Sequence, residues 1–120
     1  MPMIAIVDDD PSLRRALHRL LRSAGYVVEG FASACEFLAS GPSGRTACLV
    51  LDIRLGGMTG FELQERLAAD RAPFPVIFMT AHDDAPTRAR VQRAGVAGYL
   101  PKPFDAALLL STIQGAVSAA

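Results

Sequence analysis

Three carboxylates stand where two apolar runs of the chain end. Asp8 and Asp9 follow the apolar residues 3–7, and Asp52 follows the apolar residues 47–51. If the two runs are neighbouring strands, the carboxylates converge and repel one another unless a cation joins them. Mg²⁺ accepts oxygen ligands from carboxylates, waters and phosphates. This spacing therefore predicts a site for Mg²⁺, or for Mn²⁺, although the alternative of solvated acids at strand ends stays open.

Lys102 and Thr80 add a cation and a hydroxyl to this set. Eleven of the twelve basic residues are arginine, so a single lysine placed between Pro101 and Pro103 indicates a geometric requirement. A lysine ammonium suits a phosphoryl oxygen, and a cis Lys102–Pro103 bond would aim it inward. The Thr80 hydroxyl can donate to an anion or satisfy a strand-end carbonyl. A carboxylate nucleophile, Mg²⁺, a lysine and a hydroxyl together predict phosphoryl transfer onto Asp52.

The elements that position these residues alternate along the whole chain. Strand-length apolar runs cover residues 3–7, 26–31, 47–51, 75–79 and 96–100, and each is followed by a segment with helical periodicity. Helix starts are expected at Asp10, Ser33, Thr59, Asp83 or Asp84, and Asp105, with capping boxes at Ser33 and Thr59. Strict alternation predicts a parallel α/β sheet with helices on both faces. In such sheets the site lies beyond the carboxyl ends of the strands.

Composition narrows the classes of function. The 120 residues predict one domain, residues 1–120, with zero formal net charge. That balance gives no electrostatic reason to expect nucleic-acid binding or an anionic membrane surface, and no apolar run approaches the roughly 20 residues of a membrane span. Cys35 and Cys48 are too few for a disulfide framework, so a reducing cytoplasm is expected. Both are expected to be unreactive, with Cys48 in a buried strand.

Five motifs resemble the response-regulator receiver domain of two-component signalling. They are Val7-Asp-Asp9, Leu49-Val-Leu-Asp52, Met58-Thr-Gly60, Phe78-Met-Thr-Ala81 and Gly98-Tyr-Leu-Pro-Lys-Pro-Phe104, and they cover essentially the whole chain in order. The resemblance implies a flavodoxin-like, doubly wound (βα)5 fold with strand order 2-1-3-4-5. It also implies a switch that catalyses its own phosphorylation and dephosphorylation and turns over no metabolite.

The resemblance assigns roles to individual residues. Asp52 would accept a phosphoryl group from a phosphohistidine on a sensor histidine kinase or a phosphotransfer protein. Asp9, Asp52 and the backbone carbonyl of Arg54 would hold Mg²⁺, with Asp8 acting through water. Lys102 and Thr80 would bind the phosphoryl oxygens.

A switch and a partner surface are also implied. Thr80 would move toward the phosphoryl group, and the aromatic ring of Tyr99 would turn inward behind it. The expected surface for homodimerisation or docking runs from Asp84 to Ala120, with Arg88, Arg90 and Arg93 beside Val91, Leu108 and Leu109. The motif wording is similar to receivers of nitrogen-fixation regulators, which carry a DNA-binding helix-turn-helix. The sequence names neither the kinase nor an output domain.

One departure and two alternatives accompany this interpretation. Gly56 stands where the family often has proline, which predicts a more mobile loop. A phosphatase of the haloacid dehalogenase type needs a second aspartate where this chain has Arg54. A phosphate-insensitive docking module would be expected to lose the acids or the lysine. His18 is expected to be a solvated helix residue, and Arg54 and His82 occupy positions that tune phosphoryl lifetime in the family.

Overall fold

The computed structural model describes residues 2–42 and 44–119, and its core is a parallel sheet of five strands. The strands are β1 (Met3–Val7), β2 (Val27–Phe31), β3 (Cys48–Asp52), β4 (Val76–Thr80) and β5 (Gly98–Pro101). Their order is β2-β1-β3-β4-β5, and every pairing is parallel. The expected α/β class and strand order are therefore confirmed, whereas the two ends of the predicted domain, residues 1 and 120, lie outside the described residues.

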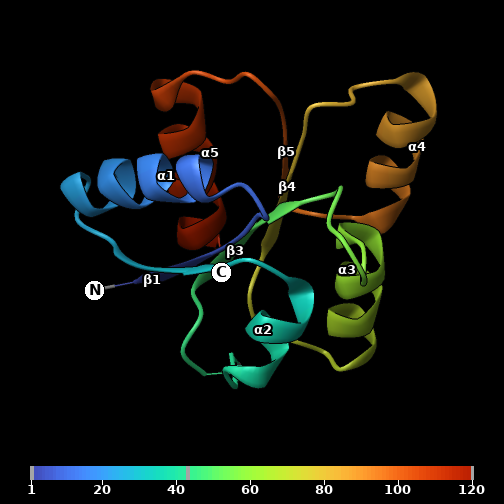
Figure 1. Cartoon of the computed structure of the whole chain (residues 1–120), viewed down its shortest axis with the longest axis horizontal. Coiled ribbons are helices and arrows are strands. Elements are labelled where there is room, and N and C mark those ends of the chain that lie inside the picture. The colour runs from blue at the N-terminus through green and yellow to red at the C-terminus, as the bar shows by residue number, and fades with distance from the viewer. Residues whose placement is uncertain (1, 43, 120) are drawn as a thin grey trace.

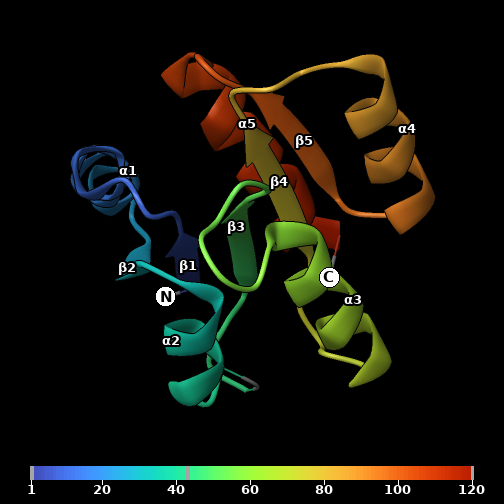
Figure 2. The ribbon, with the colours of Figure 1, turned by 45° about the vertical axis from the view of Figure 1, so that its right-hand side comes forward.

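In the described residues four helices connect the strands, a fifth follows β5, and together they cover both faces of the sheet (Figures 1 and 2). They are α1 (Pro11–Ser23), α2 (Ala34–Ala39), α3 (Gly60–Ala69), α4 (Ala85–Ala94) and α5 (Ala106–Ala119). One buried cluster packs α1 and α5 against the sheet, and a second packs α2, α3 and α4 against the other face. Because β1, β3 and β4 are covered on both sides, their sequences are continuous apolar runs rather than alternating ones.

The helix starts follow the expected capping chemistry, except that the capping box expected at Ser33 is incomplete. Asp10, Thr59 and Asp84 cap α1, α3 and α4 through side-chain oxygens that accept backbone N–H groups. Thr59 and Glu62 form a complete capping box. At α2 the box is incomplete, because the Glu36 carboxylate accepts the N–H of Ala32 instead of that of Ser33.

The strand ends differ from the expected ones by one or two residues. β3 and β4 extend through Asp52 and Thr80, because Asp52 still pairs in register with Met79 of β4. β5 begins at Gly98 rather than at residue 96. Asp52 and Thr80 are therefore held by the sheet itself rather than by the loops that follow, which restricts the positions of their side chains.

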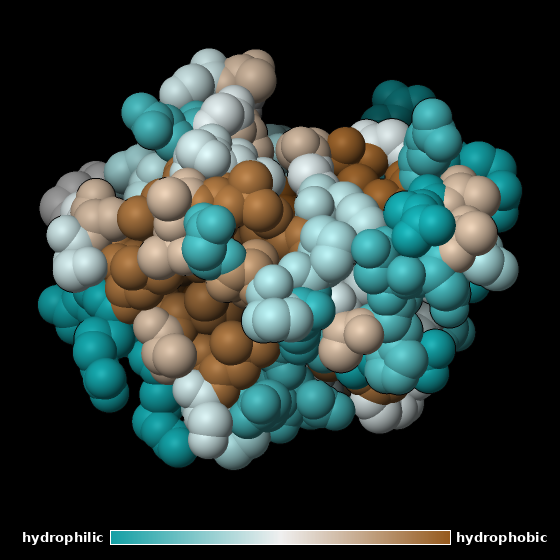
Figure 3. Space-filling model, turned by 90° about the horizontal axis from the view of Figure 1, so that it is seen from above, coloured by the Kyte–Doolittle hydropathy of each residue, from teal (hydrophilic) through white to brown (hydrophobic). Residues whose placement is uncertain are grey.

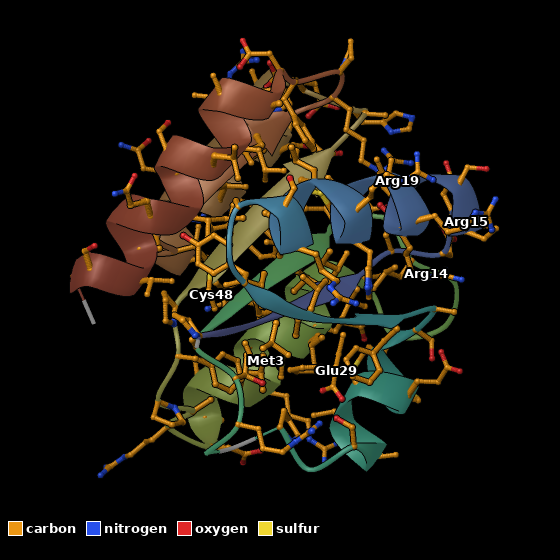
Figure 4. The ribbon with its side chains drawn as sticks, turned by 90° about the vertical axis from the view of Figure 1, so that its left-hand side faces the viewer. Met3, Arg14, Arg15, Arg19, Glu29 and Cys48 are labelled. Atoms are coloured by element: carbon orange, nitrogen blue, oxygen red, sulfur yellow. The ribbon has the colours of Figure 1, made fainter. Side chains whose placement is uncertain are left out.

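The outer surface of the helices is uneven in polarity. Arg15 and Arg19 are exposed on α1, whereas Arg14 reaches toward the sheet (Figure 4): its aliphatic part lies over Gly30 of β2, and its guanidinium donates to the carbonyl of Asp8. Figure 3 shows a broad apolar area on the side of α1 and α5. Partly buried hydrophobic side chains, Leu20 of α1 among them, pack against the core cluster beneath these two helices. Within the described part of the chain, no helix is both long and apolar enough to cross a membrane.

Candidate functional site

The three predicted carboxylates converge at the carboxyl edge of the sheet. Asp8 follows β1, Asp52 ends β3, and these two strands are hydrogen-bonded neighbours. One carboxylate oxygen from each of Asp8, Asp9 and Asp52 lies within 4.8 Å of the other two. Asp8 and Asp52 are buried and Asp9 is exposed, so the cluster opens toward solvent on one side. Three oxygen donors this close together form a set suited to a hard divalent cation.

Lys102 brings a positive charge into contact with the two buried acids. Its Nζ lies 2.9 Å from Oδ2 of Asp8 and 3.4 Å from Oδ2 of Asp52. Burial disfavours the charged ammonium, but the hydrogen bond to Asp8 and the charge of Asp52 outweigh it and raise the pKa of Lys102. The Lys102–Pro103 peptide bond is cis, as expected, and the backbone N–H of Lys102 donates to the carbonyl of Thr80 at 2.7 Å.

Asp52 is a buried acid whose pKa is shifted by its surroundings. Burial raises the pKa of its carboxyl, and the nearby charge of Asp8 acts in the same direction. The backbone N–H of Arg54, which donates to Oδ1 at 3.1 Å, and the Lys102 ammonium act in the opposite direction without cancelling the effect. The carboxylate of Asp52 therefore lacks full charge compensation from the protein, which favours a bound cation beside it.

The Thr80 hydroxyl lies on the neighbouring strand and is completely buried. Its Oγ1 accepts the backbone N–H of His82 at 3.0 Å, so the hydroxyl oxygen is held by the loop that follows β4. The hydroxyl hydrogen of Thr80 remains available as a donor. The backbone carbonyl of Thr80 accepts a hydrogen bond from the N–H of Lys102. His82 and Arg54 are exposed at the rim of the site.

Gly60 sets the distance between α3 and the chain segment that carries Asp52. A Cβ at residue 60 would lie 2.3 Å from the carbonyl oxygen of Asp52 and 2.7 Å from Cα of Ile53. The Gly60 N–H donates to the carbonyl of Ile53 at 2.9 Å. Only glycine permits this approach, so Gly60 fixes the loop 53–59, including Gly56, against the start of α3. The sequence had indicated Gly60 only as part of a motif.

Tyr99 contacts Asp83, a residue that the sequence had indicated only as a possible helix cap. The phenol OH donates to Oδ1 of Asp83 at 2.8 Å. Asp84, not Asp83, caps α4, which leaves Asp83 free to bind Tyr99 and Arg88. The contact between Tyr99 and Asp83 has no signal in the local sequence, because the pairing of β4 with β5 brings these two residues together. The contact between Arg88 and Asp83 is local, since the two residues are five positions apart.

Two apolar residues and one basic residue of the expected partner surface need correction. Val91 and Leu109 are buried in the core and only Leu108 is well exposed, at 47%. Arg90 points toward α3: its guanidinium lies 4.2 Å from the ring centre of Phe61 and pairs with Glu65 at 3.1 Å. The resemblance had implied that these side chains share one surface, but Arg90 contacts Phe61 and Glu65 of α3 instead.

Other candidates lie apart from the cluster. His18 is half-buried on α1, beside the arginines of that helix, which agrees with a role outside the chemistry. Cys48 is buried in β3 and Cys35 is exposed on α2, and both are free thiols. Burial raises the pKa of the Cys48 thiol to about 12.

Comparison with known proteins agrees with this arrangement. The family model described as the response regulator receiver domain matches residues 4–114. The chain is 41% identical over 114 residues to Nodulation protein W of Bradyrhizobium diazoefficiens, a match that covers 95% of this chain and 50% of that protein. It is 38% identical over 114 residues to the transcriptional regulatory protein FixJ of the same species, covering 95% and 56%. The chain thus spans about half the length of these relatives.

Solved structures share the fold. The response regulator StyR superposes with a TM-score of 0.90 at 45% identity, covering 98% of this chain and 60% of that one. The structure of FixJ-N gives a TM-score of 0.90 at 32% identity, covering 100% and 96%. The flavodoxin-like architecture expected from the sequence is therefore confirmed.

Proposed function

Because this chain belongs to the response regulator receiver domain family, we propose that it is a phosphorylation-activated switch with Asp52 as the phosphoacceptor. Receiver domains are signalling switches rather than metabolic enzymes. The observation that carries the proposal is the position of Lys102, whose ammonium bridges the buried carboxylates of Asp8 and Asp52 beside the exposed Asp9. A cation, a nucleophile and a metal-ligand set are thereby present at one sheet edge. We propose one domain over residues 1–120.

The residues fit a divalent cation of the Mg²⁺ or Mn²⁺ type. Asp9, Asp52 and the backbone carbonyl of Arg54 would hold it directly, and Asp8 would act through water. All are hard oxygen donors, and the raised pKa of Asp52 reflects a buried charge that a cation would stabilise. When bound, the cation would neutralise the carboxylates and the charge on the transferred phosphoryl oxygens.

The chemistry is a transfer between two protein side chains. A carboxylate oxygen of Asp52 bonds to phosphorus while the bond from phosphorus to the imidazole nitrogen of the donor's phosphohistidine breaks. That nitrogen keeps the electron pair. Lys102 already lies within reach of Asp52 and would bind one phosphoryl oxygen. The Thr80 hydroxyl would donate a hydrogen bond to a second phosphoryl oxygen. The donor would be a sensor histidine kinase or a phosphotransfer protein.

The output would be a change at the surface of α4, β5 and α5. Thr80 would move toward the phosphoryl group and Tyr99 would leave its surface position. We propose that this surface then contacts a second copy or an output domain, with Leu108 as its exposed apolar residue. A cytoplasmic location is also proposed, supported by the exposed Cys35, which is a free thiol.

The experiment is intact-mass measurement after incubation with a small-molecule phosphodonor. The parent is expected to gain one phosphoryl group with Mg²⁺ and none with a chelator. Asp52→Asn is expected to gain none, and the matched control Asp70→Asn, which changes an exposed acid at the end of α3, is expected to behave like the parent. A folded parent that gains no phosphoryl group under any condition would contradict the proposal and favour a phosphate-insensitive docking module.

A further inference from the structure

Tyr99 is held at the molecular surface by a side chain from a different element. Its ring is half-buried on β5, and its OH donates to Oδ1 of Asp83 at 2.8 Å. Asp83 lies in the loop between β4 and α4, three residues after Thr80. This hydrogen bond therefore joins the strand that carries Tyr99 to the loop that must follow any movement of Thr80.

Asp83 is itself held in place by Arg88 of α4. The Arg88 Nη1 lies 3.1 Å from the same Oδ1 atom of Asp83 and 3.2 Å from the main-chain oxygen of that residue. One carboxylate oxygen thus accepts from the phenol and from the guanidinium together. The hydrogen bond from Tyr99, and then that from Arg88, lower the pKa of Asp83, so its carboxylate is ionised at neutral pH and both bonds are charge-assisted.

Asp84, the acid next to Asp83, caps helix α4. Asp84 accepts the N–H of Thr87 at 2.8 Å and caps α4, so the helix does not depend on Asp83. The bond from Tyr99 to Asp83 is consequently not needed to start α4. Its direct effect is to restrict the position of the Tyr99 ring.

We propose that Asp83 and Arg88 are positioning residues that hold Tyr99 outward and so oppose activation of the switch. The inference rests on the proposed function, under which Tyr99 turns inward when Asp52 is phosphorylated. The phenol has to leave Asp83 in order to turn, so this bond stabilises the inactive conformation relative to the active one. Removing it shifts the conformational population before any phosphoryl group arrives.

The first test follows Tyr99 directly in the unphosphorylated protein. The chain has two tyrosines and no tryptophan, so selective labelling of tyrosine gives NMR signals from Tyr26 and Tyr99 alone. In Asp83→Ala, Tyr99 is expected to exchange between ring positions while Tyr26 stays unchanged. Asp70→Ala, which removes the exposed acid 3.9 Å from Arg66, is the matched control and is expected to leave both signals in place. A Tyr99 signal in Asp83→Ala identical to that of the parent would overturn the inference.

The second test measures the rate at which a small-molecule donor phosphorylates Asp52 with Mg²⁺. Asp83→Ala is expected to react about three- to tenfold faster, the ratio that corresponds to one hydrogen bond, and Arg88→Gln by a smaller factor. In a Tyr99→Phe background, Asp83→Ala is expected to have no further effect, because the hydroxyl is already absent. Equal effects in both backgrounds would contradict a role through Tyr99. If no variant is phosphorylated, the proposed function fails, and the NMR result still decides the contact.

Discussion

The ammonium of Lys102 lies closer to Asp8 than to Asp52, at 2.9 Å against 3.4 Å. Asp8 is fully buried, its Oδ1 accepts the backbone N–H of Asp10 at 2.9 Å, and its main-chain oxygen is bonded to the guanidinium of Arg14. Asp8 is thus the fixed member of the pair. Lys102 rests on it and still reaches Asp52, so a small movement of the ammonium suffices to meet a group bonded to Asp52.

Replacement of Lys102 is expected to destabilise the metal-free protein as well as to prevent phosphorylation. Lys102→Met leaves two buried carboxylates without their cation, and the free energy of unfolding is expected to fall by about 1–3 kcal/mol. This loss is smaller than that expected for a fully buried ion pair, because the lysine is partly exposed. Urea unfolding measures it. Arg66→Met removes a cation from an exposed pair and is expected to change stability by less than about 1 kcal/mol. Equal losses in the two variants would contradict this account.

Mg²⁺ is expected to raise the melting temperature by binding the folded state alone. The increase is expected to grow with Mg²⁺ concentration and to be largely absent in Asp9→Asn, because this exposed acid contributes to the cluster without supporting the core. Thermal unfolding at several Mg²⁺ concentrations checks it. The same shift in Asp9→Asn as in the parent would place the cation elsewhere in the molecule.

Gly60→Ala is expected to be strongly destabilising, by about 2 kcal/mol or more, since the added methyl group would lie 2.3 Å from the carbonyl oxygen of Asp52. Gly115→Ala is the matched control: nothing lies within 4 Å of a Cβ at that position in α5. There the change is expected to stabilise by roughly 0.5–1 kcal/mol. Chemical unfolding of both variants separates the close approach at α3 from a general preference of helices for alanine.

Stability is expected to fall as the pH rises above about 9. Burial raises the pKa of the Cys48 thiol from 9.0 to about 12. The unfolded chain therefore loses this proton first, and the stabilisation is fully present below pH 9 and lost progressively toward pH 12, with a slope of up to about 1.4 kcal/mol per pH unit. Burial and Asp83 raise the pKa of Tyr99 to about 12 as well, which adds to the slope above pH 10.

Unfolding by urea between pH 8 and pH 10 tests the contribution of Cys48. Cys48→Ala is expected to flatten the pH dependence, whereas Cys35→Ala, at an exposed position, is expected to retain the parent's slope. A thiol-alkylating reagent is expected to modify Cys35 alone in the folded protein and both cysteines in urea. Rapid modification of Cys48 without denaturant would be inconsistent with its burial.

The fold and the acid cluster were accessible from the sequence because both depend on where strands end. Short continuous apolar runs that are closed by Asp8, Asp52 and Thr80, and that alternate with segments of helical periodicity, indicate buried parallel strands with polar residues at one edge. Once β1 and β3 are neighbours, convergence of the carboxylates follows. β1, β3 and β4 each show an apolar run that is closed by a polar residue, so errors of one or two residues in the strand boundaries did not change the predicted fold or the predicted acid cluster.

The contacts of Tyr99 and Arg90 were not accessible, because each depends on the packing angle of an element rather than on its periodicity. The choice between Asp83 and Asp84 as a cap is a local question that two adjacent aspartates leave open. The direction of Arg90 depends on how closely α4 approaches α3, where its guanidinium lies over the ring of Phe61 and pairs with Glu65. The close approach of Gly60 to the backbone of Asp52 could not be predicted either, because a glycine in the sequence does not show which neighbouring backbone it approaches.

The solitary lysine gives this molecule its own chemical reporter. An amine-selective acylating reagent finds only one side-chain amine in the sequence, and that amine lies at the centre of the proposed site, 21% exposed and paired with two carboxylates. The reactivity of Lys102 can therefore be followed by mass spectrometry, without any radioactive donor. Because arginine supplies the other eleven Lys/Arg side chains, no second lysine competes for the reagent, and the protein offers a single side-chain amine for attachment.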